Sequence, residues 1–262
     1  MVNDENNKIL VILGMHRSGT SLVSNWLQEC GLHLGDHLYA ASKYNSKGYF
    51  EDVDFLQTHK KLLKFNGVHP SGHESPKEIN LNTEQTKILY DLLVNKNKKY
   101  RQWGWKEPRT VLFVKTYKKL LNNTYYIIIY RDHDEVVNSL IKREKISKLK
   151  RNFLFSIKIK LFKRKWFNHY SKVWTLYNKI LLDNFKLNEN CMFLNYSTLS
   201  NNYAKVIDIL NENGFDLSKK DFNQIYQHNL MSKKHYDSKL LTNKQKNEVK
   251  LITDLLEKNE LK

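Results

Sequence analysis

Residues 9–21 read I-L-V-I-L-G-M-H-R-S-G-T-S, and this stretch decides the fold. Ile9 to Leu13 is short, wholly apolar and rich in β-branched residues, which is typical of a strand buried on both faces. A glycine loop from Gly14 to Gly19 follows, and an amphipathic helical pattern begins at Thr20. A buried strand that leads through a glycine loop into a helix indicates an α/β protein with a parallel sheet.

The same apolar strand pattern recurs three times, separated by segments of helix length. Because parallel neighbours need crossovers of a dozen or more residues, four such strands predict a three-layer α/β/α fold with a central parallel sheet. No linker rich in Gly, Ser or Pro divides the chain, so we expect a single domain over residues 1–262. The strands are predicted at Ile9–Leu13, Trp103–Lys106, Tyr125–Tyr130 and Cys191–Asn195, the helices at Thr20–Glu29, Asp52–Lys64, Thr83–Val94, Asp134–Lys142, Tyr203–Asn213 and Asn243–Lys258, and a long surface loop at Gly67–Asn82.

The composition bounds the class of protein. With 40% apolar and 27% charged residues, the chain is typical of a globular domain. Its formal net charge of +17 attracts polyanions in general, including nucleic acids, anionic lipids, acidic glycans and nucleotide phosphates. Cys30 and Cys191 form neither a C-x-x-C pair nor a Cys/His cluster, which indicates a reducing, cytoplasmic compartment. The apolar run near the start is too short for a membrane span, so we expect neither a signal peptide nor a transmembrane anchor.

The loop after the first strand has the spacing of a phosphate-binding loop. Gly14 and Gly19 frame a G-x-x-x-x-G pattern, and two hydroxyl residues, Thr20 and Ser21, follow. In this geometry backbone N–H groups and a helix N-terminus can surround a phosphate. Thr20 stands where a nucleoside triphosphatase carries its lysine, and Arg17 lies inside the loop instead, which argues against ATP or GTP hydrolysis. The alternative is an ordinary tight turn between strand and helix.

H-R-S-G-T-S at residues 16–21 resembles the phosphosulfate-binding loop of sulfotransferases that use 3′-phosphoadenosine 5′-phosphosulfate (PAPS). The second half of that signature, a strand that ends in arginine with a serine eight residues later, is matched by Arg131 and Ser139. The resemblance implies the P-loop NTPase-like sulfotransferase fold, PAPS as cofactor, 3′,5′-adenosine bisphosphate (PAP) as product, and no metal. It also implies that Arg131 and Ser139 hold the 3′-phosphate, for which a guanidinium offers a planar fork; by itself, Arg131 could instead form a surface ion pair. The residues implied in cofactor binding are His16, Arg17, Ser18, Gly19, Thr20, Ser21, Arg131, Ser139 and Tyr196.

Three further stretches resemble carbohydrate- and protein-type sulfotransferases. They are K-G-Y-F-E at residues 47–51, W-G-W-K-E-P-R at residues 103–109 and F-L-N-Y at residues 193–196. With these, the resemblance covers roughly Ile9 to Phe215 and fades beyond that point.

Two departures from the cytosolic sulfotransferases bear on the adenine and on the branch of the family. Their R-K-G-x-x-G segment is absent, and Leu22 stands where they usually carry a tryptophan after the loop. Their adenine-stacking arrangement therefore cannot be transferred intact. By resemblance, Tyr196 is the candidate platform for adenine, and a buried core tyrosine is the alternative. The departures favour the carbohydrate-type branch over the branch that sulfates small phenols.

Sulfuryl transfer needs cations at the leaving phosphate and a base at the acceptor hydroxyl. Arg17 and Lys106 are the expected cations, because one lies in the loop and the other ends a neighbouring strand. Glu51 is the first choice for the base, since it opens a helix within the G-Y-F-E segment. The alternative for Glu51 is a helix N-terminal carboxylate stabilised by the helix dipole. His16 and His59 are weaker candidates for the base.

A basic helical segment at about residues 142–167 follows the 3′-phosphate motif. Between Lys142 and Lys165 it has eleven basic residues against one acid, Glu144. Phe153, Ile157 and Leu161 recur every four residues, so the segment is predicted to form a basic amphipathic helix. It could be a solvated helix of the fold, a platform for an anionic acceptor, or a helix that contacts an anionic membrane surface.

Three functions compete at this point. The first is a PAPS-dependent sulfotransferase that acts by in-line displacement on a hydroxyl of a carbohydrate or glycolipid, with an acidic acceptor as one option. The second is a small-molecule kinase with an atypical phosphate loop, which predicts dependence on ATP and magnesium. The third is a basic nucleic-acid-binding protein, for which the glycine loop would have no role. The first accounts for both halves of the motif, so we expect no nucleic-acid partner.

Overall fold

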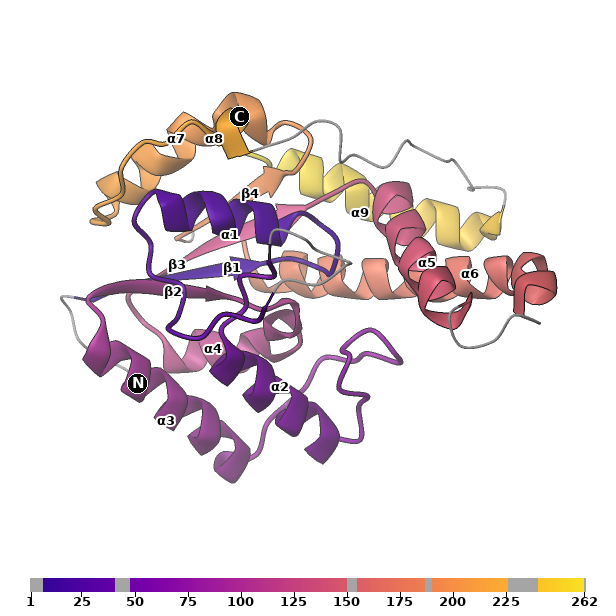
Figure 1. The fold of residues 1–262 in the computed structure, drawn as a ribbon, viewed down its shortest axis with the longest axis horizontal. Helices are drawn as coiled ribbons and strands as arrows, with labels where there is room; N and C mark the ends of the chain where they lie inside the picture. Colours follow the sequence, from indigo (N-terminus) through magenta and orange to yellow (C-terminus); the bar gives the residue numbers. More distant parts are fainter. Residues whose placement is uncertain (1–6, 41–47, 150–154, 187–189, 226–239, 262) are drawn as a thin grey trace.

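The structure, a computed structural model, describes residues 7–40, 48–149, 155–186, 190–225 and 240–261, without the side chains of 144–149 and 155–162. Within these ranges a four-stranded parallel sheet has the strand order β2-β1-β3-β4 (Figure 1). In the register of β1 with its two neighbours, Val11 lies opposite both Trp105 and Tyr126. The four predicted strands are thus confirmed to within one residue. They are β1 (Lys8–Leu13), β2 (Gln102–Lys106), β3 (Thr124–Tyr130) and β4 (Cys191–Asn195).

Ten helical segments surround the sheet in the described residues. The helix predicted at Asp52 begins one residue later, because the side chain of Asp52 caps it by accepting from the N–H of Asp54 at 2.8 Å. The helices predicted to end at Val94 and Lys142 continue to Lys99 and Leu149. The added turns are rich in lysine and lack the apolar spacing on which the prediction relied. The segments are α1 (Thr20–Glu29), α2 (Val53–Phe65), α3 (Thr83–Lys99), the 3-10 helix η1 (Pro108–Phe113), α4 (Val114–Leu120), α5 (His133–Leu149), α6 (Phe155–Asn184), α7 (Leu199–Glu212), α8 (Phe222–Ile225) and α9 (Asn243–Lys258).

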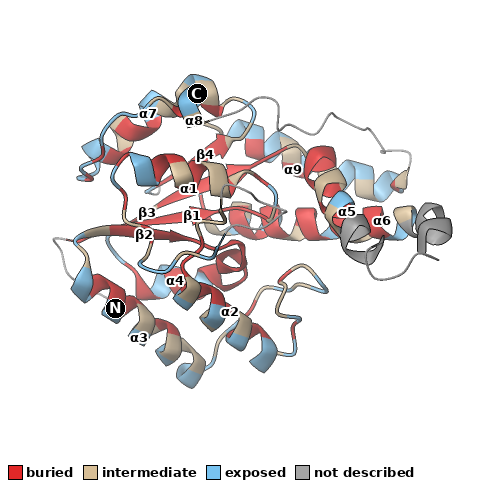
Figure 2. Ribbon diagram, in the orientation of Figure 1, coloured by how far each residue is buried: buried red, intermediate tan, exposed pale blue. Residues whose placement is uncertain are grey.

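The alternation of side chains along the buried strands creates the three layers. Ile9, Val11 and Leu13 of β1 point into one core, which they share with α2 to α6 and α9, while Leu10 and Ile12 point into a second core with α1, α7 and α8. The sheet and the helix sides that face it are buried (Figure 2). The three-layer α/β/α prediction is therefore confirmed.

The site lies where the crossover direction reverses. The connection from β1 leads to α1 on one face of the sheet, and the connection from the adjacent β3 leads to α5 on the other face. In open parallel sheets such a reversal leaves a crevice at the carboxyl ends of the two strands, and ligands bind there. The glycine loop and Arg131 follow these two strand ends.

The basic segment falls at the end of α5 and the start of α6, so its helical prediction is confirmed over residues 142–149 and 155–167. Phe153 lies outside the described residues, as do the side chains of Ile157 and Leu161. From Trp166 onward α6 belongs to the core. Among the helices that the structure describes, none combines the length and the apolar character that a membrane crossing requires.

Candidate active site

The N-terminus of α1 is open to an anion. Gly19, with φ 95°, is the N-cap residue and supplies no side-chain hydrogen bond, and the first turn of α1 contains no acidic residue. The N–H groups of Leu22 and Val23 donate to the carbonyl oxygen of Gly19 at 3.0 and 3.3 Å, which leaves those of Thr20 and Ser21 uncapped at the positive end of the helix dipole. Arg17 precedes this turn in the left-handed region, at φ 72°. The loop thus leaves backbone donors and Arg17 at the place where the sequence predicts a phosphate.

Both halves of the predicted motif meet beside this helix end. The Nε–H of Arg17 donates to Oγ of Ser139 on α5 at 2.9 Å, although the two residues are 122 positions apart in the chain. Partial desolvation lowers the pKa of Arg17, and the positive charges of Arg143 and Arg131 lower it further. Three guanidinium groups thus lie close enough to repel one another, and an anion between them would relieve that repulsion.

Arg131 is held in place from several sides. Its Nε–H donates to Oε2 of Glu135 at 2.7 Å, and its carbonyl oxygen accepts from Nε1–H of Trp174 at 3.2 Å. Its guanidinium carbon lies 4.6 Å from the centre of the Tyr196 ring, a cation–π distance. The same ring covers Gly19, where an added Cβ would lie 2.0 Å from Cδ2 of Tyr196. Tyr196 therefore joins the glycine loop to Arg131.

This contact predicts an effect on stability. Gly19→Ala should lower the free energy of unfolding by about 3 kcal/mol, because it combines a left-handed backbone with overlap against the Tyr196 ring. Gly67→Ala is the matched control, since Gly67 has φ +67° but no neighbour within 4 Å of an added Cβ. It should cost about 1 kcal/mol. Urea denaturation measures both values, and equal costs would contradict the Tyr196 contact.

Lys106, Glu51 and Ser21 form a second polar group beside the α1 N-terminus. Nζ of Lys106, a 1% exposed residue, donates to Oε1 of Glu51 at 2.9 Å and to Oγ of Ser21 at 3.3 Å. Ser21 Oγ–H in turn donates to the carbonyl oxygen of Tyr49 at 3.2 Å. Burial lowers the pKa of Lys106, and the charge of Glu51 only partly offsets it. A cation and a carboxylate thus lie together at the start of the loop helix.

The strand end beyond Lys106 carries a buried network that the sequence analysis missed. Oε2 of Glu107 lies 2.6 Å from Nδ1 of His59, and Nε2 of His59 lies 2.6 Å from the hydroxyl of Tyr117. Glu107 also forms an ion pair with Arg109, whose Nε–H donates to the carbonyl oxygen of Pro70 at 2.7 Å. His59 is fully buried with both ring nitrogens occupied, so its position does not favour a role as the base.

The predicted loop at Gly67–Asn82 brings a histidine to the site. His73 lies edge-on to His16, with ring centres 5.5 Å apart, and its Nε2 is 2.9 Å from a guanidinium nitrogen of Arg143. Burial lowers the pKa of His73 to about 3, helped by the charges of Arg143 and Arg109. Burial, then Arg109 and His73, also hold the pKa of His16 well below its usual value. Both imidazoles are therefore neutral near pH 7.

These pKa values predict how stability depends on pH. In the unfolded chain a histidine takes up its proton near pH 6.5, whereas folded His73 stays neutral down to about pH 3. The unfolded state thus binds more protons between these values, and the stabilisation is complete above pH 6.5 and lost as the pH falls. We expect the free energy of unfolding to fall by about 1–2 kcal/mol from pH 7 to pH 5 on account of His73. His73→Phe should flatten that slope in denaturant titrations; an unchanged slope would contradict the assignment.

The predicted site residues all lie at the end of the sheet where the carboxyl ends of the strands meet. Ser18 is buried in the loop, where its N–H donates to the carbonyl oxygen of Met15 at 3.2 Å, and Thr20 is buried at the start of α1. Arg143 was missed as a site residue, although its spacing was a signal. It follows Ser139 by four residues on the same helix, as Ser139 follows Glu135, so the three share one face of α5.

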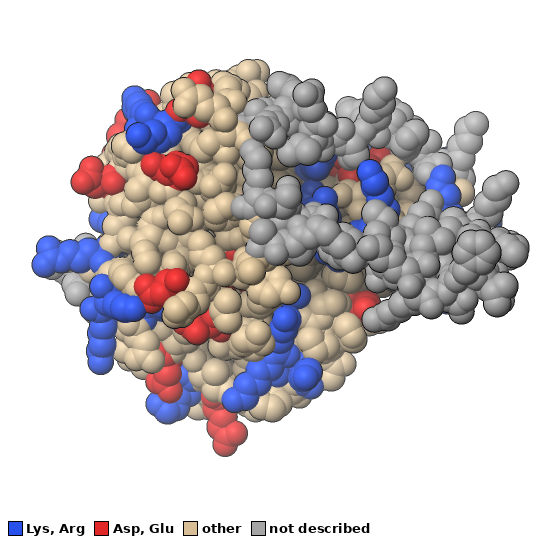
Figure 3. Space-filling view, viewed as in Figure 1, with Lys and Arg blue, Asp and Glu red and all other residues tan. Residues whose placement is uncertain are grey.

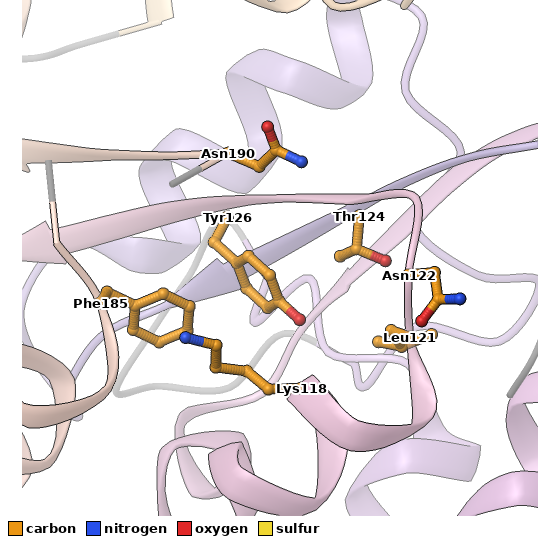
Figure 4. Close-up of a pocket in the computed structure, with 7 residues that line it drawn as sticks. All are labelled: Lys118, Leu121, Asn122, Thr124, Tyr126, Phe185 and Asn190. Atoms are coloured by element: carbon orange, nitrogen blue, oxygen red, sulfur yellow. The ribbon is translucent and has the colours of Figure 1, made fainter. Parts of the chain in front are cut away.

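A cavity of about 290 Å³ lies at the other end of the sheet. It is bordered by Thr124 and Tyr126 at the amino end of β3 (Figure 4). The Lys118 ammonium lies 4.8 Å from the centre of the Phe185 ring at its side. Because Arg131 follows the opposite end of β3, this cavity is separate from the candidate active site.

Comparison with known proteins gives the family of the chain. The model of the sulfotransferase family matches residues 10–213, so the chain belongs to the sulfotransferase family. Among curated proteins, none matches the sequence significantly.

Three solved structures are similar to this chain at low sequence identity. The sulfotransferase domain from the curacin biosynthetic pathway is 15% identical with a TM-score of 0.52, over 96% of this chain and 98% of that one. The sulfotransferase domain of the Synechococcus PCC 7002 olefin synthase is 15% identical with a TM-score of 0.47, over 98% and 97% of the two chains. Sulfotransferase STF1 from Mycobacterium tuberculosis H37Rv is 12% identical with a TM-score of 0.43, over 95% and 76%. The first of these confirms the predicted sulfotransferase fold.

Proposed function

We propose that this chain transfers a sulfuryl group from PAPS to a hydroxyl of a carbohydrate or glycolipid. The observation that carries the proposal is the convergence of Arg17, Arg131 and Ser139 at the uncapped N-terminus of α1. A donor with phosphates at both its 3′ and 5′ positions needs two cationic anchors within one nucleotide length. A nucleoside triphosphate has no 3′-phosphate and would leave Arg131 without a role.

The donor groups present fit such a nucleotide. Arg131 and Ser139 would hold the 3′-phosphate, while the α1 N–H groups, Arg17, Thr20 and Ser21 would hold the 5′-phosphosulfate. The adenine would contact Tyr196. Among the residues that the structure describes, no cluster of three or more His, Cys, Asp or Glu side chains could hold a metal ion.

Each polar group of the site has a defined part in the proposed transfer. When bound, PAPS supplies a sulfuryl group whose bond to the 5′-phosphate oxygen breaks as the acceptor oxygen bonds to sulfur. Glu51 accepts the proton of the acceptor hydroxyl, and Lys106, which contacts Glu51 at 2.9 Å, holds that carboxylate in position. Arg17 and Lys106 stabilise the negative charge that develops on the leaving phosphate.

The acceptor follows from the resemblance of residues 47–51, 103–109 and 193–196 to carbohydrate-type enzymes. The basic segment at 142–167 would lie close to the acceptor, because it continues from Ser139 along α5. The same segment would allow peripheral contact with an anionic lipid surface. We place the enzyme in the cytoplasm on account of its two buried, free cysteines.

Two rival functions receive less support. A kinase would need a lysine at Thr20 to contact the transferred phosphate. A nucleic-acid-binding protein would need a continuous basic surface, whereas acidic and basic side chains are interspersed over the left part of the described face in Figure 3.

Calorimetry with PAP tests the proposal, with ATP and a short DNA duplex as controls. PAP should bind the full chain with micromolar or lower Kd, at least tenfold more tightly than ATP in the presence of magnesium. Tighter binding of ATP, or binding of the duplex alone, would overturn the proposal in favour of one of its rivals.

A further inference from the structure

Four side chains form a cluster next to the donor loop, here called the His73 cluster: His16, His73, Arg109 and Arg143. The loop at 67–82, η1 and α5 supply three of them, and His16 comes from the donor loop itself. His16 and His73 are in ring contact, Arg143 bonds to His73, and the charges of both arginines act on both imidazoles. The donor-binding groups of the proposed function account for both phosphates of PAPS without His73 and Arg109, while His16 and Arg143 border the donor loop.

The contact with Arg143 determines the tautomer of His73. A guanidinium can only donate, so Nε2 of His73 must carry the lone pair that accepts from Arg143 at 2.9 Å. A neutral imidazole then has its proton on Nδ1. That Nδ1 is buried and has no hydrogen-bond partner among the described residues. His73 therefore presents a buried N–H donor that lacks an acceptor, an arrangement that costs free energy unless a ligand supplies one.

A second unpartnered nitrogen lies close by. Nε2 of His16 is also buried without a hydrogen-bond partner among the described residues. Arg109 is fixed through Glu107 and the carbonyl oxygen of Pro70, and the Tyr177 hydroxyl donates to the carbonyl oxygen of Gly72 at 2.6 Å. These bonds hold the loop that carries His73 in place. The donors are thus preorganised, as in a binding site.

We propose that the His73 cluster binds a negatively charged group of the acceptor, so that the substrates are alcohols bearing a carboxylate, sulfate or phosphate group close to the reacting hydroxyl. This inference rests on the proposed function. Arg143 supplies most of the charge complementarity, because the charge of Arg109 is partly balanced by Glu107, and Nδ1–H of His73 supplies a directed hydrogen bond to an oxygen of the anion. The cluster adjoins Arg17 through His16, the preceding residue, which places the anionic group next to the reaction centre.

Inorganic sulfate is the probe that tests this, titrated into the full chain saturated with PAP. We expect His73→Phe to weaken sulfate binding about tenfold while leaving the Kd for PAP within threefold. Arg101→Gln is the matched control, because Arg101 is exposed and precedes the amino end of β2, whereas the site lies at the carboxyl ends of the strands. It should change sulfate binding less than twofold.

The outcomes separate the two proposals. If PAP fails to bind the unaltered chain, the proposed function is wrong. If PAP binds but sulfate binds His73→Phe as well as the unaltered chain, sulfate occupies only the transfer position, and the His73 cluster is not an acceptor site. Nitrogen-15 spectra of the histidines give an independent check, since His73 should be protonated on Nδ1 and its signal should shift on addition of sulfate. Protonation on Nε2 instead would overturn the inference.

Discussion

Arg131→Gln should weaken the binding of PAP about 100-fold and leave that of adenosine 5′-phosphate within threefold. The loss corresponds to about 2.7 kcal/mol, the worth of one or two charge-assisted hydrogen bonds to the 3′-phosphate, which adenosine 5′-phosphate lacks. Arg17→Gln should instead weaken both nucleotides about equally, because Arg17 lies in the loop that would hold the 5′-phosphate. Isothermal calorimetry measures all four affinities.

Two controls make this result interpretable. Arg101→Gln removes an exposed arginine at the amino end of β2, away from the site, and should alter the affinity for neither nucleotide. Removing Arg131 leaves the Glu135 carboxylate buried without its 2.7 Å partner, so the fold could suffer. Arg131→Gln combined with Glu135→Gln removes both charges and should show the same selective loss for PAP. Equal losses for the two nucleotides in the double variant would place the 3′-phosphate elsewhere.

Glu51→Gln should lower the turnover of PAPS at least about 100-fold while leaving the Kd for PAP within threefold. General bases contribute about 10²–10⁴ to rates, and an amide cannot accept the proton. The slow transfer to water, followed as release of PAP from PAPS, measures the effect without knowledge of the acceptor. Glu74→Gln, at an exposed position of the 67–82 loop, should leave the rate within twofold.

His16 is the alternative to Glu51 as the general base. It is neutral at pH 7, adjoins Arg17 and has an unpartnered ring nitrogen, so it could serve as the base in place of Glu51. If Glu51→Gln keeps more than a third of the activity and His16→Gln loses it, the assignment of Glu51 is wrong. The geometry favours Glu51, because its Oε1 lies 2.9 Å from Nζ of Lys106, the cation expected at the leaving phosphate.

The sheet was predictable because buried parallel strands are continuous apolar runs, and the donor loop was predictable because its glycines and Arg17 have a fixed spacing. Helix α6 was not foreseen as far as Asn184. Between Trp166 and Leu181 only Lys172 and Lys179 are exposed, so this part of the chain lacks the polar face that reveals a helix. Such a helix lies in the core, and its sequence resembles that of other buried segments.

The His73 cluster was not predictable from the sequence for a different reason. His73 lies in a loop without periodicity, and its contact with Arg143 spans 70 residues. Nothing local to His73 indicates which helix it meets. Arg143 itself was within reach, because it continues the spacing of four from Glu135 through Ser139. A search for cations one turn after a motif serine would have found it.

At Arg17 the demands of stability and of donor binding are opposed, because the backbone is left-handed. A side chain in this conformation costs about 1–2 kcal/mol that glycine would not incur. A library of variants selected for thermal resistance alone should therefore enrich Arg17→Gly, and the winners would be robust but inactive. Tolerance to heat and retention of the sulfate donor would then rank the variants in opposite order, which marks the residue as one kept for its charge and reach.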